Sequence, residues 1–221
     1  MSNDTSCSGW QLYVIVDQDA VAGRDLAWIA EQAIRGGADV IQLRAKAAST
    51  RDLIEHAQRL REVTQAGKVP LVINDRVDVA LAVGAEGVHL GQDDLPVAVA
   101  RRLLGPGRIL GKSTHTLDQA READRDGVDY LAVGPIFSTP TKPDSPHVGL
   151  RLIRDVKAHV QRPMVAIGGI DLTTLSEVMA AGAQCVAVVR AVSAAGDPAT
   201  AARDLKRLLI QHARTQSVSK L

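Results

Sequence analysis

Short apolar runs rich in β-branched residues alternate along this chain with stretches of amphipathic helical periodicity. Such alternation is typical of repeated βα units that build a parallel sheet. Runs such as QCVAVV are almost continuously apolar, which indicates strands covered on both faces. Eight such runs can be counted, at residues 12–16, 39–43, 71–74, 87–90, 109–112, 129–134, 164–168 and 184–189.

The clearest helical patterns lie between these runs, at residues 25–35, 50–65, 149–160, 173–181 and 198–213. A glycine precedes several of the strands, as in GAEGVHLG and AGAQCVAVV, where it can end the preceding helix. No G-x-G-x-x-G follows the first strand, so an open dinucleotide-binding sheet lacks its fingerprint. We therefore expect a single (β/α)8 TIM barrel at residues 10–213, between a disordered polar leader at 1–9 and a polar tail at 214–221.

Charge and composition exclude several classes of partner. The 26 basic and 25 acidic residues form no long run of either sign, so neither nucleic acid nor an anionic membrane is an expected partner. Aromatic residues make up 2% of the chain, too few for a base-stacking platform. No apolar run approaches the length of a membrane span, and the first residues do not resemble a signal peptide. We expect small-molecule substrates, in a chain whose oligomeric state, a homo-oligomer included, the sequence leaves open.

The two cysteines and the last three residues bear on the cellular compartment. Cys7 and Cys185 fit neither a disulfide framework nor a zinc-binding spacing, which suits the reducing cytoplasm. Residues 219–221 read Ser-Lys-Leu, the form of a peroxisomal address. We interpret that match as a coincidence within a polar tail, and expect a cytoplasmic protein.

Polar clusters follow four of the apolar runs, at the point where each predicted strand ends. All strand C-termini of a parallel barrel open on one face, so these clusters are expected to converge on one pocket. Acidic residues suited to a metal ion are combined there with cations and amides suited to phosphates, which indicates an enzyme. The clusters are Gln42, Arg44 and Lys46; Asn74 and Asp75; Gln92, Asp93 and Asp94; and Thr139, Thr141 and Lys142.

The first cluster follows the second strand. Arg44 and Lys46 are two residues apart and would present a guanidinium fork and a point charge to the same anion. A solvated loop with ordinary basic residues is the alternative. Gln42 alternates with Ile41 and Leu43, so its amide should face the barrel interior and find a hydrogen-bond partner there.

Two carboxylates at neighbouring strand ends, Asp75 and Asp94, are the candidate ligands of Mg²⁺, which is seldom held by protein groups alone. Helix N-capping is the alternative for both. His89 lies within a strand and is expected to be a hydrogen-bonded core histidine rather than a ligand. His115 is a weaker functional candidate, and Ser113 has no His-Asp relay that would indicate a hydrolase.

The loops after the seventh and eighth strands match the place where (β/α)8 enzymes often bind a phosphate. Gly168 and Gly169 would let the backbone approach such a ligand, and Val189 and Arg190 follow the eighth strand. A simple strand-to-helix turn is the alternative for the two glycines.

Taken in order, these segments resemble the thiamine-phosphate synthase family over about residues 10 to 200. The resemblance implies Mg²⁺-dependent coupling of 4-amino-2-methyl-5-hydroxymethylpyrimidine diphosphate to 4-methyl-5-(2-hydroxyethyl)thiazole phosphate, with release of diphosphate. The matching segments are Gln42-x-Arg44-x-Lys46, Asn74-Asp75, His89-x-Gly91-Gln92-x-Asp94, Gly111-x-Ser113-x-His115-Thr116, Gly134-Pro135-Ile136-Phe137-x-Thr139-x-Thr141-Lys142 and Ile167-Gly168-Gly169-Ile170.

The resemblance also implies a role for each matching residue. Asp75 and Asp94 would bind Mg²⁺, and Arg44, Ser113 and Lys142 would be catalytic. Residues that would bind the pyrimidine diphosphate are Gln42, Arg44, Lys46, Asn74, Ser113 and Lys142. Residues that would bind the thiazole phosphate are Thr139, Thr141, Gly169, Val189 and Arg190.

This chain departs from the family pattern at two positions, and two other functions compete with the synthase. Ala45 stands where the family usually has glutamate, and Arg190 stands where it often has a serine that contacts the thiazole phosphate. A thiazole tautomerase of the same fold would use a histidine, here His115, but has no need of the acidic pair. A silent barrel that only binds a phosphorylated ligand is the non-enzymatic alternative.

Overall fold

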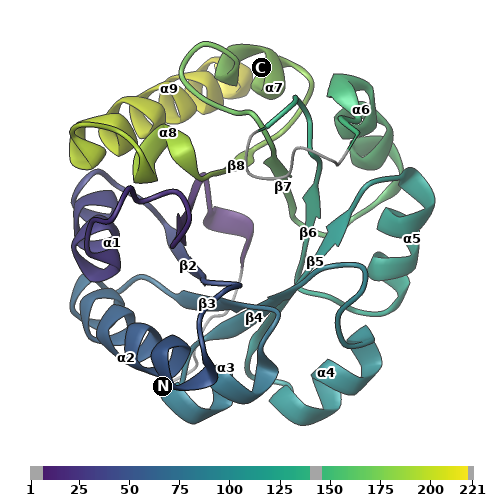
Figure 1. Ribbon diagram of the computed structural model, residues 1–221. Helices are drawn as coiled ribbons and strands as arrows, with labels where there is room; N and C mark the ends of the chain where they lie inside the picture. The colour runs from purple at the N-terminus through teal and green to yellow at the C-terminus, as the bar shows by residue number, and fades with distance from the viewer. Residues whose placement is uncertain (1–6, 140–145, 219–221) are drawn as a thin grey trace.

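Eight parallel strands close into a barrel in sequence order, with β1 paired to both β2 and β8. The structure is a computed structural model that describes residues 7–139 and 146–218. Helices ring the strands on all sides when the molecule is viewed along the barrel (Figure 1), so the predicted (β/α)8 fold is confirmed. The strands are β1 Leu12–Asp17, β2 Val40–Arg44, β3 Leu71–Asn74, β4 Gly87–Leu90, β5 Ile109–Thr114, β6 Tyr130–Val133, β7 Met164–Ile167 and β8 Cys185–Val188.

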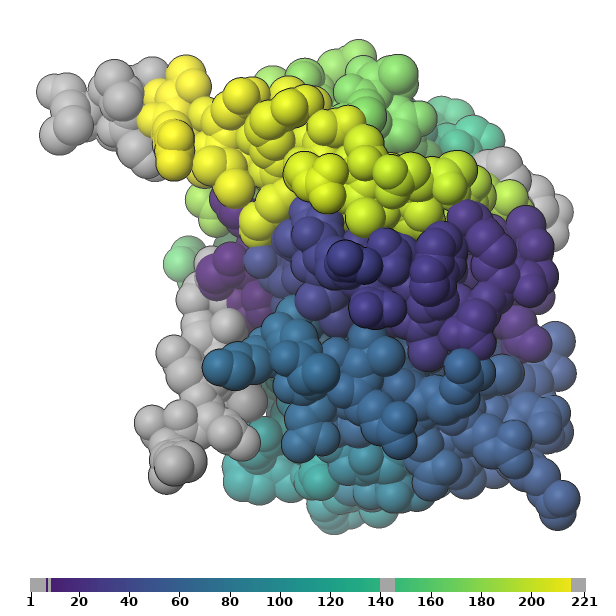
Figure 2. All heavy atoms as spheres, turned by 90° about the vertical axis from the view of Figure 1, so that its left-hand side faces the viewer, coloured from purple at the N-terminus to yellow at the C-terminus, as the bar shows by residue number. Residues whose placement is uncertain are grey.

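The helices form the outer layer. Figure 2 shows α9, α1 and α2 stacked side by side on one flank, as their mutual contacts require. No helix in the described part of the chain is both long and apolar enough to cross a membrane. The α-helices are α1 Leu26–Arg35, α2 Thr50–Gly67, α3 Val77–Val83, α4 Val97–Leu104, α5 Leu117–Arg125, α6 Gly149–His159, α7 Leu175–Ala180, α8 Arg190–Ser193 and α9 Pro198–Val218.

The structure corrects the expected ends of the barrel. Cys7–Gly9 form a 3-10 helix, and Cys7 is buried rather than part of a disordered leader, because it packs in the apolar cluster at the closed end of the barrel. Trp10 lies in the same region, with its ring 5.5 Å from that of Tyr130. At the other end of the chain, α9 continues to Val218, beyond the expected limit of 213. The Ser-Lys-Leu ending lies outside the described residues.

Alternate residues of each strand face the interior of the barrel. Tyr13, Val40, Val72, Ile109 and Tyr130 form an inner cluster at the end where the strands begin. The apolar neighbours of these residues in sequence belong to the larger core between strands and helices. Both faces of every strand are therefore covered, which explains the continuous apolar runs of the sequence.

The same alternation carries polar residues to the interior near the opposite end of the strands. The parallel register places Gln42 beside Ile15 and Asn74 beside His89, and all four side chains line one cavity. A shift of one residue would turn each of them toward the helices.

Candidate active site

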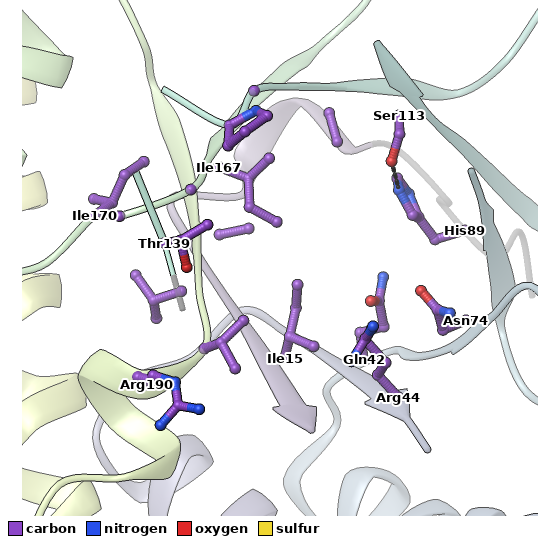
Figure 3. Close-up of a pocket in the computed structure, with 18 of the residues that line it drawn as sticks. Ile15, Gln42, Arg44, Asn74, His89, Ser113, Thr139, Ile167, Ile170 and Arg190 are labelled. Carbon is purple, nitrogen blue, oxygen red and sulfur yellow. Dashed lines mark hydrogen bonds between the residues drawn. The ribbon is translucent and has the colours of Figure 1, made fainter. Parts of the chain in front are cut away.

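A cavity of about 470 Å³ opens at the C-terminal ends of the strands. In Figure 3, Gln42, Arg44 and Asn74 lie on one side of it and Arg190 lies across from them, with Ile15 and Ile167 between the two groups. The structure thus brings the first, second and fourth strand-end clusters to one cavity, the fourth through Thr139, whereas the cluster of Gln92, Asp93 and Asp94 does not line it. Predicted site residues on its wall are Gln42, Arg44, Lys46, Asn74, Asp75, Ser113, Thr139, Gly169, Val189 and Arg190.

Among the predicted site residues that the structure describes, Asp94 is not on this wall. It contacts Asp75, which does line the cavity. Thr141 and Lys142 lie outside the described residues, so their predicted roles remain predictions.

Arg44 is held by a buried carboxylate that sequence reasoning did not single out. Its Nη1 lies 2.5 Å from Oδ2 of Asp17, the residue beside it in the register of β1 and β2. The Asp17 side chain is 1% exposed and that of Arg44 is 13% exposed. The guanidinium is therefore fixed at the wall of the cavity rather than solvated in a loop. The one available signal was an aspartate ending the apolar run LYVIVD.

Lys46, Asp75 and Asp94 form a connected charged group. Lys46 Nζ lies 3.2 Å from Oδ2 of Asp75, and the Asp75 carboxyl hydrogen-bonds that of Asp94. Burial and the adjacent Asp94 carboxylate raise the pKa of Asp75. Burial also acts to raise the pKa of Asp94, but hydrogen bonds from Asp75 and the Gly91 amide outweigh it, so that this pKa is lowered. Two adjacent carboxylates repel one another when both are ionised, and a bound cation would relieve that repulsion.

Neither carboxylate caps a helix, so the capping alternative is wrong for both. The caps of α3 and α4 are Arg76 and Pro96, and neither makes a side-chain capping hydrogen bond. Asp94 instead accepts a hydrogen bond of 2.6 Å from the Gly91 amide within its own loop. Asp75 has a positive φ of 64°, which is uncommon outside glycine and turns its carboxylate toward the cavity.

The donor set fits a hard divalent cation. Within residues 7–139 and 146–218, no group of three or more His, Cys, Asp or Glu side chains could hold a metal by itself. A pair of adjacent carboxylates at the edge of a cavity that also carries Arg44 and Lys46 suits Mg²⁺, which commonly takes one or two carboxylates and completes its shell with water and substrate phosphates.

The structure confirms that Gln42 and His89 are interior, hydrogen-bonded side chains. Gln42 is 2% exposed, and its Nε2 donates to the Tyr13 hydroxyl at 2.8 Å. His89 is 8% exposed and contacts Ser113 Oγ through Nε2 at 2.9 Å, a contact drawn as a dashed line in Figure 3. His89 is thus a hydrogen-bonded core histidine, yet it also lines the cavity.

The opposite side of the cavity is built from backbone and small residues. Gly168 and Gly169 both have positive φ, of 101° and 64°. The loop after β6 packs directly on them: the Phe137 amide donates to the Gly168 carbonyl at 3.0 Å. A Cβ at Gly169 would lie 2.6 Å from the Phe137 Cβ and 2.8 Å from the Ser138 carbonyl oxygen. Close backbone approach requires both glycines, which goes beyond a simple turn.

Substitution of Gly169 by alanine tests this packing. We expect Gly169→Ala to destabilise the protein by about 1–3 kcal/mol, because the added Cβ combines left-handed strain with a steric overlap. It should also raise the KM for a phosphorylated ligand bound at this loop, measured by steady-state kinetics. Gly107→Ala is the matched control, since a Cβ there meets nothing within 4 Å. Equal stability and kinetics in the two variants would contradict both the tight packing at Gly169 and the binding of a phosphorylated ligand at this loop.

Fold and cavity together define a (β/α)8 barrel with a pocket at the C-terminal ends of its strands, where enzymes of this fold have their active sites. The family model described as thiamine monophosphate synthase matches residues 12–192. This chain belongs to that family.

Individual relatives agree with the family match. The chain is 54% identical to a thiamine-phosphate synthase of Chloroflexus aurantiacus over 90% of this chain and 93% of that protein. A thiamine-phosphate synthase of Shouchella clausii is 46% identical, with 89% and 94% covered. A solved thiamine phosphate pyrophosphorylase of Pyrococcus furiosus superposes with a TM-score of 0.85 at 37% identity, covering 92% of this chain and 96% of that one.

Proposed function

We propose that this chain is a thiamine-phosphate synthase that couples 4-amino-2-methyl-5-hydroxymethylpyrimidine diphosphate to 4-methyl-5-(2-hydroxyethyl)thiazole phosphate, releasing diphosphate. One observation of the structure carries the proposal beyond family membership. A single cavity has a cationic and acidic side at Arg44, Lys46 and Asp75 and a glycine-rich side at Gly168 and Gly169. Two phosphorylated substrates require two such sides within reach of one another.

The diphosphate belongs on the first side. Arg44 offers a fixed guanidinium whose geometry suits phosphate oxygens, and Lys46 adds a more mobile charge, with its side chain 52% exposed. Asn74 adds an amide at the end of β3. Lys142 is assigned to the same group by the family pattern alone.

The thiazole phosphate belongs on the second side. The backbone at Gly169 and the strand end at Val189 border the cavity together with Thr139 and Arg190. Arg190 is exposed, so its guanidinium reaches the cavity from the rim. We propose that it contacts the phosphate from there, with Thr141 assigned by the family pattern.

The chain's residues stabilise the leaving group and exclude water. When the C–O bond to diphosphate breaks, negative charge grows on the leaving oxygens, which Arg44 and Lys46 stabilise in place. The aminopyrimidine ring spreads the positive charge that remains on its methylene carbon, and the thiazole nitrogen then attacks that carbon. Gln42 and Ser113 orient the pyrimidine, and apolar Ile15 and Ile167 reduce access of water to the cation.

Mg²⁺ is proposed as the cofactor, held by Asp75 and Asp94. When bound, it would neutralise charge on the diphosphate. The adjacency of the two carboxyls, which raises the pKa of Asp75, supports this assignment. We further propose a cytoplasmic location, which the two free thiols, Cys7 and Cys185, favour.

The direct test is an assay of the purified chain with both substrates, with and without Mg²⁺, following thiamine phosphate as its fluorescent oxidation product. We expect product only when Mg²⁺ is present. Product formed equally well after metal removal by a chelator would overturn the metal assignment. Folded protein that gives no product, but isomerises the thiazole phosphate or merely binds it, would identify a tautomerase or a silent barrel instead.

A further inference from the structure

Five polar side chains form an unbroken chain of hydrogen bonds through the barrel interior. Gln42 Nε2 lies 2.8 Å from the Tyr13 hydroxyl, which lies 2.9 Å from the Tyr130 hydroxyl. The Tyr130 hydroxyl lies 2.9 Å from His89 Nδ1, and His89 Nε2 lies 2.9 Å from Ser113 Oγ. Its two ends, Gln42 and Ser113, line the cavity, whereas the two tyrosines do not.

The two tyrosines at the centre of this chain of hydrogen bonds are shielded from water. Both tyrosines are 1% exposed, and no buried side-chain nitrogen or oxygen in the described part of the protein is without a hydrogen-bond partner. Burial raises the pKa of Tyr13 and of Tyr130, so each hydroxyl keeps its single proton at neutral pH. In such a site every donor must face an acceptor, because an unmade hydrogen bond is costly.

Gly111 makes the central link possible. It lies on β5 between His89 on β4 and Tyr130 on β6, in register with both. A Cβ at this position would overlap the Tyr130 ring. The missing side chain lets the Tyr130 hydroxyl reach across one strand to His89.

The hydrogen bond between Gln42 and Tyr13 determines which partner donates in each of the other hydrogen bonds of this series. Gln42 donates through Nε2, so Tyr13 accepts there and its own proton points to Tyr130. Tyr130 must then donate to His89 Nδ1, which places the ring proton of His89 on Nε2, facing Ser113. The serine oxygen accepts that bond and keeps its own proton for the cavity. At the other end, Gln42 keeps its carbonyl oxygen for the cavity.

We propose that Tyr13, Tyr130 and His89 are positioning residues that give two walls of the pocket opposite hydrogen-bonding character: an acceptor at Gln42 and a donor at Ser113. The ligand class that matches is a heteroaromatic ring carrying an amino donor beside a ring-nitrogen acceptor. This inference rests on the proposed function, whose aminopyrimidine substrate has such an edge. Neither tyrosine touches the substrate, because their effect is transmitted through Gln42 and Ser113.

Replacement of one central hydroxyl tests the proposal. We expect Tyr130→Phe to lower kcat/KM for the pyrimidine diphosphate by about tenfold or more, the equivalent of one or two hydrogen bonds. The KM for the thiazole phosphate should change less than twofold. Tyr13→Phe should also impair use of the pyrimidine substrate, because Gln42 loses its anchor while the Tyr130 to His89 link remains.

Nitrogen-15 NMR of the histidine rings provides a readout that does not depend on activity. In the substrate-free protein, His89 should be the Nε2-protonated tautomer, with its signals assigned by their loss in His89→Gln. Tyr130→Phe should abolish that preference, and Tyr13→Phe should weaken it, because the Tyr130 hydroxyl then no longer receives the proton that obliges it to donate to His89. Val165→Ala is the packing control: Val165 lies in the same inner cluster and has no polar atom, so it should lower Tm without changing the tautomer.

The outcomes separate this inference from the proposed function. In one outcome, the wild-type protein makes no thiamine phosphate while His89 shows the expected tautomer and Tyr130→Phe abolishes it. That result would support the series of hydrogen bonds and contradict the proposed function. An active wild-type protein with the proton on Nδ1 would overturn the inference. So would a Tyr130→Phe variant whose tautomer and pyrimidine kcat/KM both match those of wild type.

Discussion

Replacing Asp75 by asparagine is expected to lower Mg²⁺-supported turnover on the order of 100-fold or more, because charge neutralisation by a metal contributes several kcal/mol to such a step. Asparagine tolerates the left-handed backbone of this position, so the loop geometry should persist. The measurement is kcat as a function of Mg²⁺ concentration. Asp93→Asn is the matched control, since Asp93 is an exposed acid in the loop that carries Asp94 and does not line the cavity.

The same variant should be more stable than wild type in the absence of metal. The folded state raises the pKa of Asp75 above its unfolded value, so ionising this group costs stability as the pH rises through the raised pKa. Asparagine does not ionise, so the variant avoids this cost. Its lost ion pair with Lys46, whose side chain is 52% exposed, is worth little. A lower metal-free Tm, together with unchanged Mg²⁺ dependence, would contradict the metal assignment.

Replacing Arg44 by methionine is expected to cost about 3–5 kcal/mol of stability, because Asp17 would be left as an unpaired buried charge. Denaturant unfolding at neutral pH measures this loss. Turnover should fall as well, since the diphosphate loses its fixed guanidinium. Arg59→Met is the matched control: its pair with Asp25 is exposed, with side chains 56% and 43% accessible, and should contribute less than about 1 kcal/mol.

A double variant separates the structural and functional roles of Arg44. Arg44→Met combined with Asp17→Asn should recover much of the lost stability, because the buried negative charge is gone. It should not recover turnover. Full recovery of kcat/KM for the pyrimidine diphosphate in the double variant would show that Arg44 serves only to neutralise Asp17.

The sequence was sufficient for the strands and for the face on which the site lies. A strand in a barrel is covered on both faces, so it can be recognised from a short apolar stretch of sequence alone. LVIN at 71–74 and GVHL at 87–90 are examples. Boundaries were less predictable. The polar segment ARTQSV looked frayed, yet α9 continues through it to Val218.

The site was predictable to the extent that its residues stand at strand ends. Arg44, Asn74 and Asp75 could be grouped because parallel strands all end on one face. The sequence could not show that Asp17 pairs with Arg44, since that contact depends on the register of β1 and β2.

The sequence by itself determined the repeated βα pattern, the polar residues at its strand ends and the family that they resemble. Only the tertiary structure decided which of these residues touch. Tyr13 and Tyr130 read as ordinary core aromatics in sequence, yet their hydroxyls meet across a separation of 117 residues. For Asp75 and Asp94 the sequence left helix capping open as an alternative, and the pairing of β3 with β4 brings them together as a carboxyl pair. The reason is physical: periodicity records which face a side chain takes, whereas hydrogen bonds and pKa shifts depend on distances that barrel closure fixes.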